Sequence, residues 1–272
     1  MGEIIAIVSQ KGGVGKTTTV INLGASLAAK GKSVLLIDMD PQRQVAASFH
    51  ISDYELRTGI ADILSSEKIK TADAVIPSAI TGLHIATFAS ARREEKSSRD
   101  VLINQETEWY DLAKQFGKKY DFVLLDCPSS SEVITNAALK VAHSVIVPVQ
   151  CEYYALKSLG ILLRQIQQIK IHDNPELRYR GILVTMVDLR SRLARLVWER
   201  LQLTLKGTLF NTFIPRNIRL AEVPLYGQPV QQIDRSSAGA KSYCELAGEI
   251  LHQSGTGASS LPKKQLKLAN NY

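Results

Sequence analysis

The sequence predicts a doubly wound α/β fold, in which a mainly parallel sheet carries helices on both faces. Strand-like apolar runs alternate with helical patterns along most of the 272 residues. Several runs are apolar throughout, such as Val34-Leu35-Leu36-Ile37 and Val145-Ile146-Val147, as in strands that are covered on both faces. A glycine-rich turn also joins the first strand to the first helix, which is typical of phosphate-binding α/β domains.

The expected elements follow one another from the N-terminus to about residue 252. Strands are expected over residues 3–8, 33–37, 83–88, 122–125, 144–149, 181–185 and 209–214. Helices are expected over residues 17–29, 55–65, 104–117, 132–141, 155–170, 191–205 and 238–252. No internal linker or repeat interrupts this series, so we expect one domain over 1–253. Residues 254–272 are polar, rich in Gly and Ser, and then basic, which predicts a flexible tail.

The composition fits a globular protein of a reducing compartment. Hydrophobic residues make up 45% of the chain, and the three cysteines show no C-x-x-C spacing, which argues against a disulfide framework or a zinc site. No apolar run approaches the roughly 20 residues of a spanning helix, and no signal peptide is recognisable, so a cytoplasmic location is expected. The net charge of +7 suggests an acidic partner, either nucleic acid or an anionic membrane surface.

A phosphate-binding loop is predicted between the first strand and the first helix. The sequence Lys-Gly-Gly-Val-Gly-Lys-Thr-Thr over residues 11–18 follows the apolar run of residues 4–8. In this setting, backbone N–H groups and the helix dipole converge on an anion. The Lys16 side chain can reach the β- and γ-phosphates of a nucleotide, and the Thr17 hydroxyl can hold Mg²⁺. The expected ATP contacts are Gly12, Gly13, Val14, Gly15, Lys16, Thr17 and Thr18.

This loop departs from the ordinary P-loop pattern, which has glycine where this chain has Gln10. It carries a second lysine, Lys11, at its start. Lys11 is either a solvated loop charge or a group that reaches phosphate across a dimer interface. The pattern K-G-G-x-G-K-T is the signature of the deviant Walker A ATPases, so a P-loop NTPase of that kind is predicted.

Carboxylates are expected beside this loop, at the ends of two buried strands. Asp38 and Asp40 end the second strand, and Asp126 ends the run of residues 122–125. A lone aspartate at such a place is usually a helix cap or a turn former. Two acidic strand ends beside a phosphate loop instead predict a Mg²⁺ site, because ligands of parallel sheets bind at this edge.

The chain resembles the ParA/Soj branch of the ParA/MinD superfamily from Gln10 to Tyr243. The resemblance rests on QKGGVGKTTT, VLLIDMDPQ, YDFVLLDCPSS, PVQCEYYALKSL, GILVTM, IPRNIRLAEVPLYGQPV and DRSSAGAKSY. It implies an ATPase with weak basal activity that dimerises around two ATP molecules and separates after hydrolysis. It further implies partition of a chromosome or plasmid with a ParB-like adaptor that stimulates the ATPase.

The same resemblance implies a role for each residue of the site. Three residues would be catalytic: Lys11 on the partner's nucleotide, Lys16 on the β- and γ-phosphates, and Asp40 on the attacking water. Thr18 would contact the α-phosphate. The Mg²⁺ group would consist of Thr17, Asp38 and Asp126, and the adenine pocket of Met186, Pro215 and Asn217.

Three departures from the family pattern lie close to these residues. Ser129 stands in place of the second proline of Asp-x-Pro-Pro, Ser9 stands in place of an asparagine, and Arg43-Gln44 replaces Gly-Asn. They bear on the placement of water and on the hydrolysis rate more than on ATP binding.

Arginines suggest a surface for double-stranded DNA. Arg190, Arg192, Arg195 and Arg200 cluster around one predicted helix, and Arg216 and Arg219 lie in the IPRNIRL turn. A charge cluster alone is usually a solvated helix face. The resemblance implies that Arg190 and Arg219 bind DNA without sequence preference and associate the protein with the nucleoid.

Other functions of the same fold remain open. A MinD-like membrane ATPase would need an amphipathic C-terminal helix, and the tail LPKKQLKLANNY is too short for one, so membrane binding is not expected. A redox protein like the nitrogenase iron protein would need paired cysteines. Positioning of a non-DNA cargo stays open, because the cargo adaptor is a separate protein.

Overall fold

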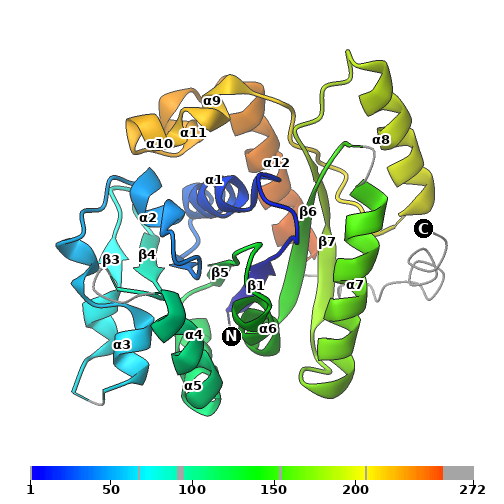
Figure 1. Ribbon diagram of the computed structural model, residues 1–272. Coiled ribbons are helices and arrows are strands. Elements are labelled where there is room, and N and C mark those ends of the chain that lie inside the picture. The colour runs from blue at the N-terminus through cyan, green and yellow to red at the C-terminus, as the bar shows by residue number, and fades with distance from the viewer. Residues whose placement is uncertain (1, 67, 91–94, 153–154, 206, 254–272) are drawn as a thin grey trace.

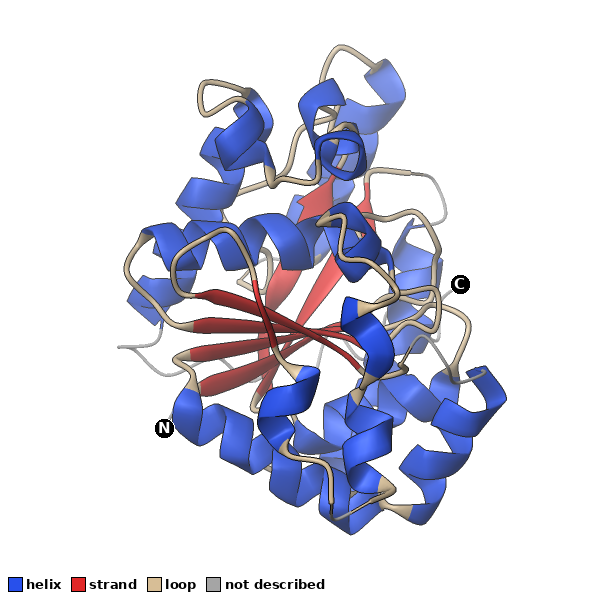
Figure 2. Cartoon of the chain, turned by 90° about the vertical axis from the view of Figure 1, so that its left-hand side faces the viewer, coloured by secondary structure: helices blue, strands red, loops and turns tan. Residues whose placement is uncertain are grey.

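The computed structural model describes residues 2–66, 68–90, 95–152, 155–205 and 207–253. These residues form one seven-stranded sheet with helices on both faces, which confirms the predicted doubly wound fold (Figures 1 and 2). The strand order is β3-β4-β2-β5-β1-β6-β7, and only the β3–β4 pair is antiparallel. The strands are β1 Glu3–Ile7, β2 Val34–Asp38, β3 Ile76–Pro77, β4 Leu83–Thr87, β5 Phe122–Asp126, β6 Ser144–Gln150 and β7 Arg178–Thr185.

The strand order changes direction at β1, which lies between β5 and β6. After β1 the chain crosses through α1 to β2 on one side, and it later builds β6 and β7 on the other side. Such a switch point opens a crevice at the carboxyl ends of the strands, where ligands of these sheets bind. The loop after β1 is the glycine-rich loop, so the fold places it in that crevice.

Alternate residues of each strand feed two separate cores. On one side, Ile5, Ile7 and Leu36 pack with residues of α1 and α12; on the other, Ala6 and Leu35 pack with residues of α5, α6 and α7. The described helices are α1 Lys16–Ala29, α2 Gln44–Ser48, η1 Glu55–Arg57, α3 Ile60–Leu64, η2 Thr71–Ala74, α4 Glu95–Asn104, α5 Glu106–Lys119, α6 Glu132–Val141, α7 Ala155–His172, α8 Arg192–Thr204, α9 Ile218–Ala221, α10 Val223–Tyr226, α11 Val230–Ile233 and α12 Ala238–Gln253.

The strand predicted over residues 209–214 is wrong. This segment forms no continuous ladder with β7: Leu209 makes an isolated bridge to Ile182, and just beyond the segment Pro215 makes another to Val187, which follows β7. Between them, the carboxylate of Glu249 accepts hydrogen bonds from the backbone N–H groups of Asn211 (2.8 Å) and Thr212 (3.1 Å). A side chain therefore takes the donors that a continuous strand would use.

The helix predicted over residues 55–65 is also wrong as one element, since it divides into η1 and α3 at Gly59. Gly59 has an extended backbone, and a Cβ there would lie 2.5 Å from the backbone nitrogen of Ser90. The extended backbone interrupts the helix, and the chain passes another backbone there too closely for any residue larger than glycine. The helix predicted over 104–117 is α5, which starts after a separate α4; short helices such as α2 and α9 to α11 were not predicted.

The predicted tail, residues 254–272, lies outside the described residues. Within the described part of the chain, no helix combines the length and the apolar character needed to cross a bilayer.

Candidate functional site

The glycine-rich loop forms a cradle at the N-terminus of α1, as the sequence predicts. Gly13 (φ 73°) and Gly15 (φ 87°) adopt left-handed conformations, which glycine reaches without strain. Gly15 precedes α1, and no side chain caps the first N–H groups of this helix. These donors are therefore available to an anion, and the helix dipole favours negative charge there.

A hollow of about 390 Å³ lies over this loop. It brings together the phosphate loop, the loop after β2 and the turn after β5, which are far apart in the sequence. Its lining includes Gly12, Gly13, Gly15, Lys16, Thr17, Thr18 and Asp40, all predicted from the sequence, together with Gln42, Gln44, Ser129, Ser130 and Met186. A larger hollow of about 640 Å³ lies among the N-terminal ends of the strands, away from this loop.

Asp38 and Asp126 form a buried carboxylate pair beneath the loop. They are partners in the register of β2 and β5, and both are almost completely buried. Asp126 Oδ2 accepts a hydrogen bond from Thr17 Oγ1 at 2.7 Å, and Asp38 accepts from the backbone N–H groups of Val45 (2.7 Å) and Asp40 (3.1 Å). Thr17, Asp38 and Asp126 thus lie together, as predicted.

Burial dominates the electrostatics of this pair. Desolvation raises the pKa of Asp126 to about 7 and, together with the nearby charge of Asp126, raises the pKa of Asp38 well above its usual range. Asp126 Oδ1 is buried without a hydrogen-bond partner among the described residues. A buried oxygen of this kind beside a threonine hydroxyl fits Mg²⁺, which needs few carboxylates when a bound phosphate supplies other ligands.

Lys16 places a buried cation in the same space. Its side chain reaches toward the start of the loop, with Nζ 3.4 Å from the carbonyl oxygen of Lys11. Burial lowers the pKa of Lys16, and the negative charges of Asp126 and Asp40 act in the opposite direction. An incoming phosphate would therefore meet a lysine that the fold already holds in the cradle.

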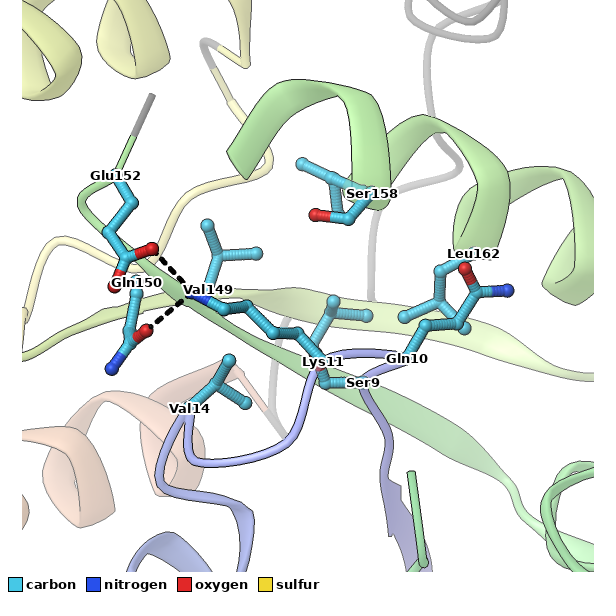
Figure 3. Close-up of a pocket in the computed structure, with 11 residues that line it drawn as sticks. Ser9, Gln10, Lys11, Val14, Val149, Gln150, Glu152, Ser158 and Leu162 are labelled. Atoms are coloured by element: carbon cyan, nitrogen blue, oxygen red, sulfur yellow. Dashed lines mark hydrogen bonds and ion pairs between the residues drawn. The ribbon is translucent and has the colours of Figure 1, made fainter. Parts of the chain in front are cut away.

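Lys11 points away from this cradle, toward the end of β6 (Figure 3). Its Nζ donates to Gln150 Oε1 at 3.0 Å and forms a short ion pair with Glu152. Gln150 in turn donates to the carbonyl oxygen of Gly13 at 3.2 Å. Lys11 therefore has partners within one protomer, where it joins its own loop to the end of β6.

Another hollow, of about 380 Å³, adjoins the loop on the side of α9 and α12. It brings Met186, Pro215 and Asn217 together, as predicted for an adenine pocket. Its lining also includes Thr18, Thr185, Ile214, Ile218, Leu220 and Tyr243, of which Thr18 was assigned to phosphate and the rest to no site. Aliphatic and aromatic side chains around a few polar groups suit a flat heterocycle.

The loop after β2 contains a non-glycine residue in a left-handed conformation. Arg43, at a position where glycine is usual, has a left-handed backbone with φ 53° and ψ 41°. Its guanidinium lies 3.6 Å from the Asp53 carboxylate. The sequence departure at residue 43 was thus a signal of a glycine-like backbone position, which here is occupied by a larger residue.

Arg190 and Arg219, the predicted DNA contacts, lie on neighbouring segments, since Val187 pairs with Pro215. Each already has an acidic partner. Arg190 makes two hydrogen bonds of 2.8 Å to the carboxylate of Asp188, and Arg219 donates to Glu222 at 2.9 Å. Both arginines remain substantially exposed, so phosphates can reach them.

Comparison with known proteins agrees with this geometry. Residues 2–179 match the family described as AAA domain. The chain is 39% identical over 261 residues to the sporulation initiation inhibitor protein Soj of Bacillus subtilis, covering 92% of this chain and 98% of that protein. It is 37% identical over 254 residues to the chromosome partitioning protein ParA of Myxococcus xanthus, covering 92% and 88%.

Solved structures show the same fold. Cobyrinic acid a,c-diamide synthase from Mycobacterium smegmatis, with bound ADP and magnesium, has a TM-score of 0.77 at 30% identity and covers 96% of this chain and 98% of its own. The cell division ATPase MinD of Pyrococcus furiosus, at 24% identity, has a TM-score of 0.71 over 93% and 99% of the two chains and shows the fold alone. The chain therefore belongs to the Soj/ParA family of chromosome-partitioning ATPases.

Proposed function

We propose that this protein is an ATP-dependent switch that dimerises on ATP, binds double-stranded DNA without sequence preference and partitions DNA with a ParB-like adaptor. One observation carries the proposal. The phosphate cradle, the Thr17–Asp126 pair and the Met186–Asn217 hollow adjoin one another at the carboxyl edge of the sheet. A nucleoside triphosphate with its cation requires these three environments side by side.

Different residues of the chain would bind the phosphates, the Mg²⁺ ion and the adenine of ATP. Gly12 to Thr18 would hold the phosphates through backbone N–H groups, with Lys16 on the β- and γ-phosphates. Thr17 and Asp126 would hold Mg²⁺, with Asp38 supporting them from beneath. Bound Mg²⁺ would supply neutralisation of the phosphate charge. Met186, Pro215 and Asn217 would enclose the adenine.

Hydrolysis depends on Asp40, which lines the same hollow and accepts a hydrogen bond from the backbone N–H of Gln42 at 3.0 Å. We assign it to orienting the attacking water. Lys11 would complete the site only in a dimer, by contacting the partner's nucleotide. Because Lys11 is held by Gln150 and Glu152 in one protomer, the isolated protein would hydrolyse ATP slowly until an adaptor and DNA favour the complete site.

DNA binding would use Arg190 and Arg219, and pairing of two protomers would double the number of arginines on one surface. Contacts of this kind to phosphate are independent of sequence and sensitive to salt. The protein would then be cytoplasmic and associated with the nucleoid.

Light scattering with and without Mg-ATP tests the switch. We expect the wild-type protein to change from monomer to dimer with ATP, and Asp40→Ala to bind ATP and stay dimeric. Lys16→Ala should remain a monomer, because it loses the central phosphate contact. A wild-type protein that is equally dimeric without nucleotide would contradict the proposal.

A further inference from the structure

Helix α8 exposes an apolar stripe on the surface of the molecule. One side of α8 is anchored, because Ala194 and Leu201 are buried and Trp198 packs edge-on against Phe213 with a centroid distance of 5.3 Å. The opposite side exposes Leu193, Leu196 and Leu203, with 53%, 54% and 79% of each residue accessible. Three large aliphatic residues on one exposed helix face are unusual for a surface without a partner.

The spacing of this stripe favours a helix as its partner. The stripe has the spacing of a coiled-coil seam, with intervals of three, four and three residues between Leu193, Leu196, Arg200 and Leu203. Residues spaced in this way form a narrow line along the helix. A helix that lies in a lipid surface presents a broader apolar face, and Arg192 and Arg200 interrupt such a face here.

The charge around the seam is positive. Arg192, Arg195 and Arg200 are exposed on α8, and Glu199 is the one acidic residue of this helix. Arg190, just before α8, adds a further positive charge, partly balanced by Asp188. A second copy of α8 would bring these arginines together, and any other basic segment would be repelled in the same way, so the charge favours an acidic partner.

We propose that α8 is a docking site for an acidic amphipathic helix of another protein. Apolar residues of that helix would pack on the seam of Leu193, Leu196 and Leu203, with a carboxylate opposite Arg200. This partner is distinct from ATP, DNA and the ParB-like adaptor. The site also adjoins the segment that holds Lys11, since Cys151, next to Glu152, lies with its Sγ 3.0 Å from the carbonyl oxygen of Ala194.

The test uses the full chain and a three-heptad synthetic peptide with leucine at both core positions and glutamate at the flanking positions. Fluorescence anisotropy of the labelled peptide should show saturable binding, and circular dichroism should show that the peptide becomes helical. Leu196→Ser and Leu203→Ser should each weaken binding about tenfold or more, because each removes a leucine that the complex buries. Leu225→Ser, which changes a leucine of similar exposure on α10, is the matched control and should bind as the wild type does.

Three results would overturn the proposal. One is equal binding of a peptide with lysine in place of every glutamate, and another is unchanged binding by both leucine variants. The third is a protein that does not bind the acidic peptide but sediments with phosphatidylglycerol vesicles, or with a second copy of itself, in a way that depends on Leu196 and Leu203. Unchanged thermal unfolding and ATP binding of the variants would show that they are folded.

Discussion

Glu152 is expected to restrain dimerisation, because it holds the Lys11 side chain that the proposed ATP dimer needs. The substitution Glu152→Gln removes the charge of this residue while preserving most of its shape. The Lys11 and Glu152 side chains are 44% and 55% exposed, so water screens the pair and its loss is worth about 0.5–1 kcal/mol per protomer. A symmetric dimer breaks two such pairs, which gives about 1–2 kcal/mol, or roughly a 5- to 30-fold tighter dimer.

Sedimentation equilibrium with Mg-ATP measures this effect, with Asp40→Ala in the background of every sample to prevent hydrolysis. Glu176→Gln removes an exposed carboxylate just before β7, away from Lys11, and is the matched control. We expect a lower dissociation constant for Glu152→Gln and no change for Glu176→Gln. A dimer that is equally stable or weaker in Glu152→Gln would show that Glu152 does not compete for Lys11.

Three further predictions concern the fold and the metal site. Gly59→Ala should lower the free energy of unfolding, measured in urea, by about 1–3 kcal/mol, because its Cβ would meet backbone atoms of Ser90 and Phe88. The control Gly248→Ala should be neutral or stabilising, because the space around Gly248 in α12 is open. Arg43→Gly should be more stable than Arg43→Ala by about 1 kcal/mol in the same assay, since only glycine adopts φ 53° without strain, and equal stabilities would contradict the strained backbone. Thr17→Ala should lose the increase in ATP affinity that Mg²⁺ gives to the wild type in calorimetry. Thr19→Ala, the same change two residues further along α1, should retain it, because the Thr19 hydroxyl bonds to Tyr243 and not to Asp126.

The phosphate cradle could be predicted from the sequence because its chemistry is local. Gly13, Gly15 and Lys16 lie within a few residues of one another, and strand–loop–helix spacing alone fixes their arrangement. Asp38 and Asp126 could also be predicted, since the carboxyl ends of parallel strands meet at one edge of a sheet.

The partners of Lys11 could not be predicted, because they depend on tertiary contacts across the sheet. Glu152 follows β6, which is adjacent to β1 in space but far from Lys11 in the sequence. The same holds for residues 209–214, where a strand-like apolar pattern is overridden by hydrogen bonds from Asn211 and Thr212 to Glu249. Competition by a distant side chain leaves no signal in local periodicity.

Binding of unrelated DNA duplexes, measured against salt concentration with and without Mg-ATP, tests the central proposal most directly. We expect that binding requires ATP, is independent of sequence and weakens steeply with salt, with a slope of about −0.9 in log K against log salt for each neutralised phosphate. Arg190→Glu should abolish binding and leave ATP-driven dimerisation intact, because Arg190 bonds to Asp188 outside the phosphate cradle. A wild-type ATP dimer that does not bind DNA but sediments with anionic liposomes would contradict the proposed DNA binding and favour a MinD-like membrane ATPase.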